Sequence, residues 1–237
     1  MSEFSIKTRQ KNLQRMKDEE FDFLVIGGGI TGAAVARDAA SRGLKVALVE
    51  KRDFAWGTSS RSSKLVHGGL RYLENMEFGL VFEALAERSI LLKNAPHMVR
   101  PLDFYLPVYK GDSHGMGLFS LGLWLYDLLA LLRTPRFHER LSAKSLLQKI
   151  PCLTSDGLTG GFSYSDASMW DDGLVVETLR SAHEMGAAIA NYTEALEPIW
   201  SGKEISGYWL KDKSIFEDKA EPFQVRAKST VTCAGPW

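Results

Sequence analysis

A glycine motif directly follows the first apolar segment and constrains the fold more than any other feature of the sequence. Gly27, Gly29 and Gly32 form the pattern G-x-G-x-x-G between the apolar run 21–28 and the alanine-rich segment 30–43. The apolar run is typical of a strand that is buried on both faces of a parallel sheet. The alanine-rich segment predicts a helix that packs closely against that sheet.

A second apolar run, residues 44–50, completes a strand–helix–strand unit and ends at Glu50. In this context the glycines allow a tight turn and a close approach of the backbone to a pyrophosphate, which the helix N-terminus also favours. Glu50 lies about 20 residues beyond the glycines, where an acidic side chain accepts hydrogen bonds from a ribose. Such a residue disfavours NADP. A glycine-rich turn in an ordinary α/β domain is the alternative interpretation.

The rest of the chain alternates between helical and extended patterns. Helices are expected at residues 77–98, 116–132 and 174–187, strands at 103–109, 159–170 and 188–195, and an antiparallel meander in 199–212 and 222–237. The fold class is therefore α/β, a Rossmann-like domain with a parallel sheet plus an antiparallel meander, interrupted by a mixed α+β layer that faces the substrate. Residues 1–20 are expected to form a surface helix.

Composition excludes several classes of protein. The chain has 237 residues, 45% of them apolar, and 29 acidic residues balance 29 basic ones, so no overall field attracts nucleic acid. Two cysteines form no metal-ligand pattern and predict free thiols in a cytoplasmic setting. His97, His114, His138 and His183 lack ligand spacing, so no metal is assigned. Segment 116–132 is too short to span a membrane. We expect it to form a helix, and we favour burial of this helix in the protein over a position on a membrane surface.

The segment 58–74 combines many hydrogen-bond donors in one loop. The hydroxyl and amine groups belong to Thr58, Ser59, Ser60, Ser62, Ser63 and Lys64, and the amides of Leu65, Val66 and His67 follow them. Such a surface suits the ribityl hydroxyls, the pyrophosphate and the ring acceptors of FAD better than the smaller demands of NAD. A solvated loop with capping serines is the alternative.

Four successive segments resemble the FAD-dependent glycerol-3-phosphate dehydrogenases. They are DFLVIGGGITGAAVARDAASRGLKVALVE, TSSRSSKLVHGGLRYLE, SYSDASMWDDGLVVE and VTCAGPW. HGGLRYLE is specific to that family, whereas the glycine motif is shared by all flavoproteins of the glycine oxidase and D-amino-acid oxidase type. The family is longer than this chain, so we expect these 237 residues to be the N-terminal, flavin-binding part of a larger enzyme with little activity of its own.

The resemblance implies oxidation of sn-glycerol 3-phosphate to dihydroxyacetone phosphate by hydride transfer from C2 to flavin N5. Electrons then pass to a membrane quinone, or to oxygen in oxidase relatives, and the protein is expected to be peripheral at the cytoplasmic face of the membrane. Two alternatives remain: a flavin oxidase of the same class that acts on an amine or a hydroxy acid, and a non-catalytic FAD-binding fragment. An NAD-dependent dehydrogenase is the least favoured reading.

The resemblance also assigns residues. The implied FAD contacts are Gly27, Gly29, Ile30, Thr31, Gly32, Glu50, Lys51, Thr58, Ser59, Ser60, Ser63, Lys64, Leu65, His67, Ala234 and Gly235. Arg71 and Tyr72 match positions that face the substrate, where Arg71 would bind the phosphate; a salt bridge from Arg71 to Glu74 or Glu77 is the alternative. His67 is a weak candidate for the general base, and the main catalytic groups are expected beyond Trp237.

The expected domains follow from these assignments. Residues 21–100 and 171–237 would form the FAD-binding domain, and residues 101–170 part of a substrate or cap domain. Asp171 and Asp172 resemble a carboxylate pair, but they are better explained as N-capping residues of a helix that starts at Gly173.

Overall fold

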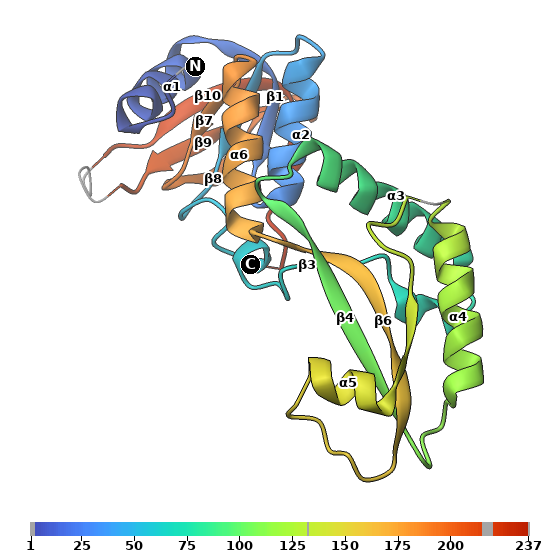
Figure 1. Cartoon of the computed structure of the whole chain (residues 1–237). Helices are drawn as coiled ribbons and strands as arrows, with labels where there is room; N and C mark the ends of the chain where they lie inside the picture. Colours follow the sequence, from blue (N-terminus) through green and yellow to red (C-terminus); the bar gives the residue numbers. More distant parts are fainter. Residues whose placement is uncertain (1–2, 132, 215–219, 237) are drawn as a thin grey trace. The chain divides into compact units, whose positions relative to one another are not determined.

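The computed structural model describes residues 3–131, 133–214 and 220–236, and the chain divides into two compact units (Figure 1). The first unit comprises Met1–Ser62 and Asp171–Trp237, and the second comprises Ser63–Trp170. The second unit thus ends where the inserted layer was expected to end, but it begins at Ser63 instead of residue 101. Residues 63–100 belong to it because their strands pair, and their helix packs, with later parts of the same unit.

The first unit is built on a six-stranded sheet with the order β7-β2-β1-β10-β9-β8. The strands are β1 (Glu20–Ile26), β2 (Val46–Val49), β7 (Ala188–Ala190), β8 (Thr193–Ser201), β9 (Glu204–Asp212) and β10 (Phe223–Thr232). β7, β2, β1 and β10 pair in parallel in this order, whereas β9 pairs antiparallel with β10 and β8 pairs antiparallel with β9. The expected parallel sheet with an antiparallel meander is confirmed, and its last strand joins the two parts.

One expected strand is in fact two. Residues 188–195 were expected to be continuous, but β7 ends at Ala190 and β8 begins at Thr193. Tyr192 between them has a φ of 47°, in the left-handed region, which turns the chain from the parallel to the antiparallel part of the sheet. Asn191, Thr193 and Glu194 interrupt the apolar pattern around this turn, a signal that the prediction of one continuous strand did not use.

Helices cover both faces of this sheet. α2 (Ile30–Ser41) and α6 (Asp171–Glu184) pack together over one face, where Leu48 lies in the same core cluster as Ala36 and Leu179. α6 begins at Asp171 itself, so Asp171 and Asp172 lie in its first turn and do not precede a helix that starts at Gly173. Acidic side chains are favourable there because of the positive end of the helix dipole.

The opposite face is covered by α1 (Ile6–Asp18), in which Leu13 and Met16 are buried against strand residues such as Phe21. The structure thus has a helix in the region expected to form a surface helix, and one side of it is buried against the sheet. Arg9 on that side is also buried: its Nη2 lies 2.5 Å from Oδ1 of Asp212, and its Nε donates to the carbonyl of Asn191 at 3.0 Å. This pair fastens α1 to the end of β9 and to the turn before β8.

The charge of Asp212 depends on Arg9. Burial raises the pKa of this carboxyl, but the hydrogen bonds from Arg9 and from the amide of Ser214 together lower it by more. The resulting pKa is below the usual value. A carboxyl with a lowered pKa stabilises the folded state above its unfolded pKa of about 4, and this contribution is lost as the pH falls through its folded pKa.

We predict that Arg9→Met lowers the free energy of unfolding by about 3–5 kcal/mol at pH 7, because it leaves the buried carboxylate of Asp212 without its cationic partner. Urea denaturation measures this loss. The deficit should shrink below pH 4 as Asp212 becomes protonated, and Arg9→Met/Asp212→Asn should recover most of it. Arg15→Met, which breaks the half-exposed pair with Glu19, is the matched control and should cost less than about 1 kcal/mol. Equal losses in both single variants would contradict the assignment.

The second unit contains a four-stranded antiparallel sheet. β4 (Val99–Tyr109) pairs along its length with β6 (Leu158–Met169), and β6 also pairs with β3 (Leu65–Val66) and with β5 (Glu139–Ser142). The helices of this unit are α3 (Phe78–Asn94), α4 (Met116–Leu129) and α5 (Ala143–Lys149), together with the 3₁₀ turn η2 (Leu70–Leu73). α3 ends two residues before Pro96, as the restriction on residues that precede proline requires.

α4 confirms the expected helix, but its expected burial holds for one face only. Tyr126 and Asp127 are buried, and the carboxylate of Asp127 accepts from Nδ1 of His138 at 2.7 Å. Leu121 and Leu128 are each 68% exposed and Trp124 is 64% exposed. Because this helix carries apolar residues on all of its faces, the sequence did not show which face is buried. Within the described residues, no helix has the length and apolar character needed to cross a membrane.

Candidate functional site

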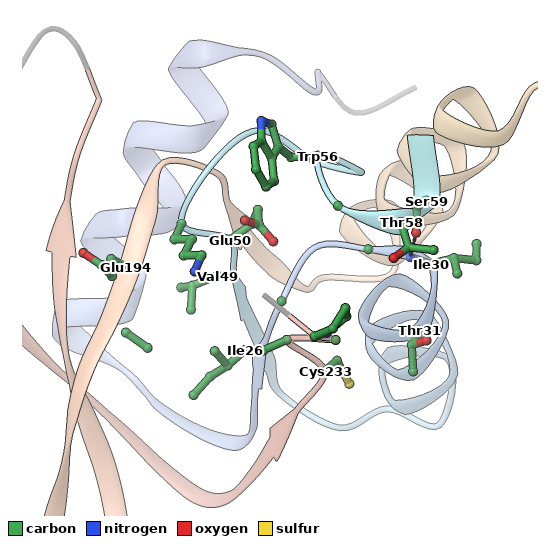
Figure 2. A pocket seen from close by; sticks show the side chains of 18 of the residues that line it. Ile26, Ile30, Thr31, Val49, Glu50, Trp56, Thr58, Ser59, Glu194 and Cys233 are labelled. Carbon is green, nitrogen blue, oxygen red and sulfur yellow. Dashed lines mark hydrogen bonds between the residues drawn. The ribbon is translucent and has the colours of Figure 1, made fainter. Parts of the chain in front are cut away.

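A cavity of about 370 Å³ lies in the first unit, where the parallel strands reach their carboxyl ends (Figure 2). Ten of the residues that the resemblance assigns to the cofactor line it: Gly27, Gly29, Ile30, Thr31, Glu50, Lys51, Thr58, Ser59, Ala234 and Gly235. They come from the turns after β1, β2 and β10, which the parallel pairing of these strands brings to one edge of the sheet. This edge is the usual ligand position in open α/β sheets.

The glycine turn has a strict steric origin. Gly27 has a φ of 118°, and a Cβ at this position would lie 2.5 Å from the carbonyl oxygen of Cys233. A Cβ on Gly32 would clash with the carbonyl oxygen of Gly27. Gly32, which the resemblance assigns to the cofactor, does not line the cavity; it allows the first turn of α2 to pack against the glycine turn.

Glu50 is held by backbone amides. Its Oε2 accepts a hydrogen bond from the amide of Gly28 at 2.7 Å, and its Oε1 accepts one from the amide of Arg52 at 2.9 Å. The carboxylate therefore bridges the glycine turn and the turn after β2. An ionised carboxylate has about four acceptor positions. Two hydrogen bonds fix its orientation and still leave capacity for donors in the cavity.

Ser59 caps the helix that the glycine turn begins. Gly29 occupies the N-cap position of α2 but has no side chain, and the amide of Ile30 donates to the Oγ of Ser59 at 2.9 Å instead. Ser59 belongs to the 3₁₀ turn η1 (Thr58–Ser60), and Figure 2 shows Thr58 and Ser59 beside Ile30 at the start of α2. The glycine turn and the first part of the hydroxyl-rich loop thus line one cavity.

The remaining cofactor assignments have other positions. Ser60 does not line the cavity, and its hydroxyl donates to the carbonyl of Gly57 at 3.4 Å. Ser63, Lys64, Leu65 and His67 belong to the second unit, and their assignment as flavin contacts stays a prediction.

Sequence reasoning missed several residues that line the cavity: Ile26, Val49, Trp56, Gly57, Thr193, Glu194, Ala195, Cys233 and Pro236. The guanidinium of Arg52 lies 3.8 Å from the ring centre of Trp56, and that of Arg61 lies 4.6 Å from it. The position of Trp56 just after β2 was an available signal. Thr193, Glu194 and Ala195 had none, because they reach the cavity through the unpredicted turn after β7, where the amide of Thr193 donates to the carbonyl of Glu50 at 2.8 Å. Burial raises the pKa of the Cys233 thiol, which keeps it protonated at neutral pH.

The second unit has its own polar cavity, of about 430 Å³. Arg71, Tyr72 and His67 line it, so the two expected substrate residues and the weak base candidate lie together. The ring centres of His67 and Tyr72 are 6.3 Å apart. No ion pair joins Arg71 to Glu74 or Glu77 in the part of the chain that the structure describes, so the alternative role for Arg71 does not appear.

A buried polar network supports the turn that carries these residues. Asp166 lines the cavity, and its Oδ1 accepts hydrogen bonds from the amide of Gly68 at 3.0 Å, from the hydroxyl of Tyr126 at 2.7 Å and from Nη1 of Arg88. Burial and the adjacent Asp166 raise the pKa of Tyr126, and the same two causes raise the pKa of Tyr164 to about 12. Both phenols therefore stay protonated at neutral pH.

No pattern in the sequence indicated this network. Asp166 lies in a serine-rich strand. Arg88 lies in the middle of a helix, where a charged residue is usually expected to be exposed to solvent. Burying the pair is expensive, since an unsatisfied buried donor costs about 1–3 kcal/mol, and Nε and Nη2 of Arg88 have no acceptor among the described residues.

The fold and the glycine-turn cavity define a dinucleotide-binding flavoprotein domain, and comparison with known proteins identifies its family. The model of the FAD dependent oxidoreductase family matches residues 22–237, so the chain belongs to this family. The aerobic glycerol-3-phosphate dehydrogenase of Staphylococcus saprophyticus is 42% identical over 230 residues, which are 97% of this chain and 41% of that protein.

Solved structures agree with this result. The glycerol-3-phosphate dehydrogenase from Bacillus halodurans, complexed with FAD, superposes with a TM-score of 0.76 at 34% identity, covering 99% of this chain and 38% of that one. The L-alpha-glycerophosphate oxidase from Mycoplasma pneumoniae shares the fold, with a TM-score of 0.61 at 17% identity over 91% of this chain and 54% of that one. The chain thus spans about two fifths of the length of the curated relatives that it matches.

We predict that Glu50→Ala weakens FAD binding by about 1.5–3 kcal/mol, the range for hydrogen bonds to a charged group. Because the variant also leaves the amide of Gly28 without its acceptor, it should lower the free energy of unfolding of the FAD-free protein by about 1–3 kcal/mol. Flavin fluorescence titration and urea denaturation measure the two effects. Glu194→Ala, at the same cavity, is the control and should change stability little. Unchanged flavin affinity in Glu50→Ala would contradict the role.

Proposed function

We propose that this chain is the FAD-binding part of an enzyme that oxidises sn-glycerol 3-phosphate to dihydroxyacetone phosphate. The observation that carries the proposal is the cavity in which Glu50, Thr58 and Ser59 converge on the glycine turn. It occurs in a chain that is 42% identical over nearly its whole length to aerobic glycerol-3-phosphate dehydrogenases.

The residues of this cavity suit FAD. Ser59 takes the amide of Ile30, while the next amides in the first turn of α2 have no partners within the helix and are available to a pyrophosphate. Glu50 retains acceptor capacity for ribose hydroxyls, and Thr58 and Ser59 offer hydroxyls of their own. When bound, FAD supplies a two-electron acceptor for the hydride of the substrate.

The second-unit cavity suits the phosphate end of the substrate. Arg71 presents an exposed guanidinium without an ion-pair partner in the described chain, and the fork of its N–H groups matches a phosphate. Tyr72 offers a hydroxyl beside it. This chemistry favours a phosphate ester over glycerol, which lacks the anion. We assign no general base, and His67 remains a weak candidate.

We predict that Arg71→Met weakens binding of sn-glycerol 3-phosphate by roughly 10- to 150-fold, the equivalent of about 1.5–3 kcal/mol for one charge-assisted contact. Isothermal titration of the FAD-loaded chain measures the dissociation constant. FAD affinity is the control and should not change. If sarcosine or a 2-hydroxy acid bound through Arg71 and sn-glycerol 3-phosphate did not, the enzyme would be another flavin oxidase of this class.

We further propose that the acceptor is a membrane quinone and that α4 contacts the membrane surface at the cytoplasmic face. The support is the exposed row of Leu121, Trp124 and Leu128 on one face of this helix. Large apolar side chains gathered on one exposed face are typical of an interfacial helix.

We predict that Leu121→Asp/Leu128→Asp lowers the fraction of protein that sediments with phospholipid vesicles by at least about fivefold, because two buried leucines are worth roughly 3 kcal/mol or more at an interface. Leu196→Asp/Trp200→Asp, which alters exposed apolar residues of β8 in the first unit, is the matched control and should leave sedimentation unchanged. Equal sedimentation of both variants would argue against membrane contact through α4.

A further inference from the structure

A buried cation lies next to the second-unit cavity and has no part in the proposed function. The side chain of Arg88 is fully buried, and its Nη1 donates to the carboxylate of Asp166 and to the carbonyl of Ser165 at 3.0 Å. Its Nε and Nη2 find no acceptor within the described chain. An ion pair with two unsatisfied nitrogens stabilises a fold poorly, and apolar residues of similar volume often serve as well. Stability therefore does not explain why this position carries an arginine.

Asp166 gives the reason for a cation. It lines the same cavity as Arg71, and its Oδ1 holds the amide of Gly68, which fixes the turn that leads to Arg71 and Tyr72. A carboxylate therefore helps to shape the cavity in which Arg71 is proposed to bind an anion. An unneutralised carboxylate there would repel a phosphate and compete with it for the Arg71 guanidinium.

We infer that Arg88 is the internal counter-ion that keeps this cavity receptive to a phosphomonoester dianion. It neutralises Asp166 from the core, so that Asp166 holds the turn without pairing with Arg71. Arg88 is a positioning residue, since it acts through Asp166 and lines no part of the cavity. The inference rests on the proposed function in one respect, the binding of the substrate phosphate by Arg71.

The other groups near Asp166 do not replace Arg88. Tyr126 donates a neutral hydrogen bond and carries no charge at neutral pH. Tyr164 is a phenol whose raised pKa keeps it neutral, and His67 and Arg71 are exposed on the cavity side. Arg88 is the cation in hydrogen-bond contact with Asp166 among the described residues. Without Arg88, no cation among the described residues would contact Asp166, and its negative charge in the cavity wall would be left unneutralised.

The experiment measures dissociation constants of the FAD-loaded chain for inorganic phosphate and for sn-glycerol 3-phosphate by NMR titration at constant ionic strength. The variants are Arg88→Met, Asp166→Asn and Arg88→Met/Asp166→Asn, with glycerol as the uncharged ligand. Arg88→Met should weaken phosphate binding on the order of threefold to tenfold, because it leaves a net charge in the cavity wall. The double variant should restore the affinity, since asparagine keeps an oxygen for the amide of Gly68. Asp166→Asn alone should bind phosphate at least as tightly as the wild type.

The outcomes separate the inference from the proposed function. If Arg88→Met and the double variant lose affinity equally, or if Asp166→Asn binds phosphate more weakly than the wild type, Arg88 is merely structural and the inference is overturned. If Arg88→Met does not fold, the Asp166→Asn and double variants still decide by the sign of their change. If wild-type affinity is independent of Arg71, as Arg71→Met would show, the proposed substrate site fails and the inference fails with it.

Discussion

The arrangement of the first unit depends on the close approach of three backbone segments at Gly27. Its amide donates to the carbonyl of Val49 at 2.8 Å, and the amide of Cys233 donates to the carbonyl of Ile26 at 2.7 Å. These bonds continue the parallel pairing of β1 with β2 and β10 just past the ends of the strands. Gly32 then allows α2 to start directly beside the turn. A side chain at either glycine would clash with the neighbouring backbone and separate these segments, which would distort the cavity.

Once the strand ends are fixed, side chains from distant parts of the sequence reach one edge. Glu50 follows β2 and Ser59 lies nine residues later, yet both accept hydrogen bonds from the glycine turn and the start of α2. Each therefore completes the local structure as well as lining the cavity. Such double roles hold these side chains in position in the absence of a ligand, and a preorganised site loses less conformational entropy on binding.

Features of the fold and the site were predictable where the residues involved lie close together in the sequence, and were missed where they lie far apart. The β1–α2–β2 unit was predictable because its signals are local: two apolar runs, three glycines and an acidic residue. The burial of α1 was not, since Arg9 meets Asp212 only after the sheet has formed. Likewise Asp166 and Arg88 are joined by the pairing of β6 with β4 and by the packing of α3, for which the sequence carries no pattern. The start of the second unit at Ser63 was missed for the same reason, because it depends on the two-residue strand β3.

The two cavities offer an anion different kinds of positive potential. In the first unit backbone amides and a helix N-terminus supply the positive potential, and the carboxylate of Glu50 is itself held by amides, so geometry recognises the ligand. In the second unit formal charges dominate: Arg71 faces the cavity, Asp166 shapes it, and Arg88 balances Asp166 from the core. A single substitution can change which ligand is recognised by formal charges, whereas ligand recognition by backbone groups changes only if the fold itself changes. Within such a family the cofactor is therefore expected to stay constant, while substrate choice varies with a few side chains of the second unit.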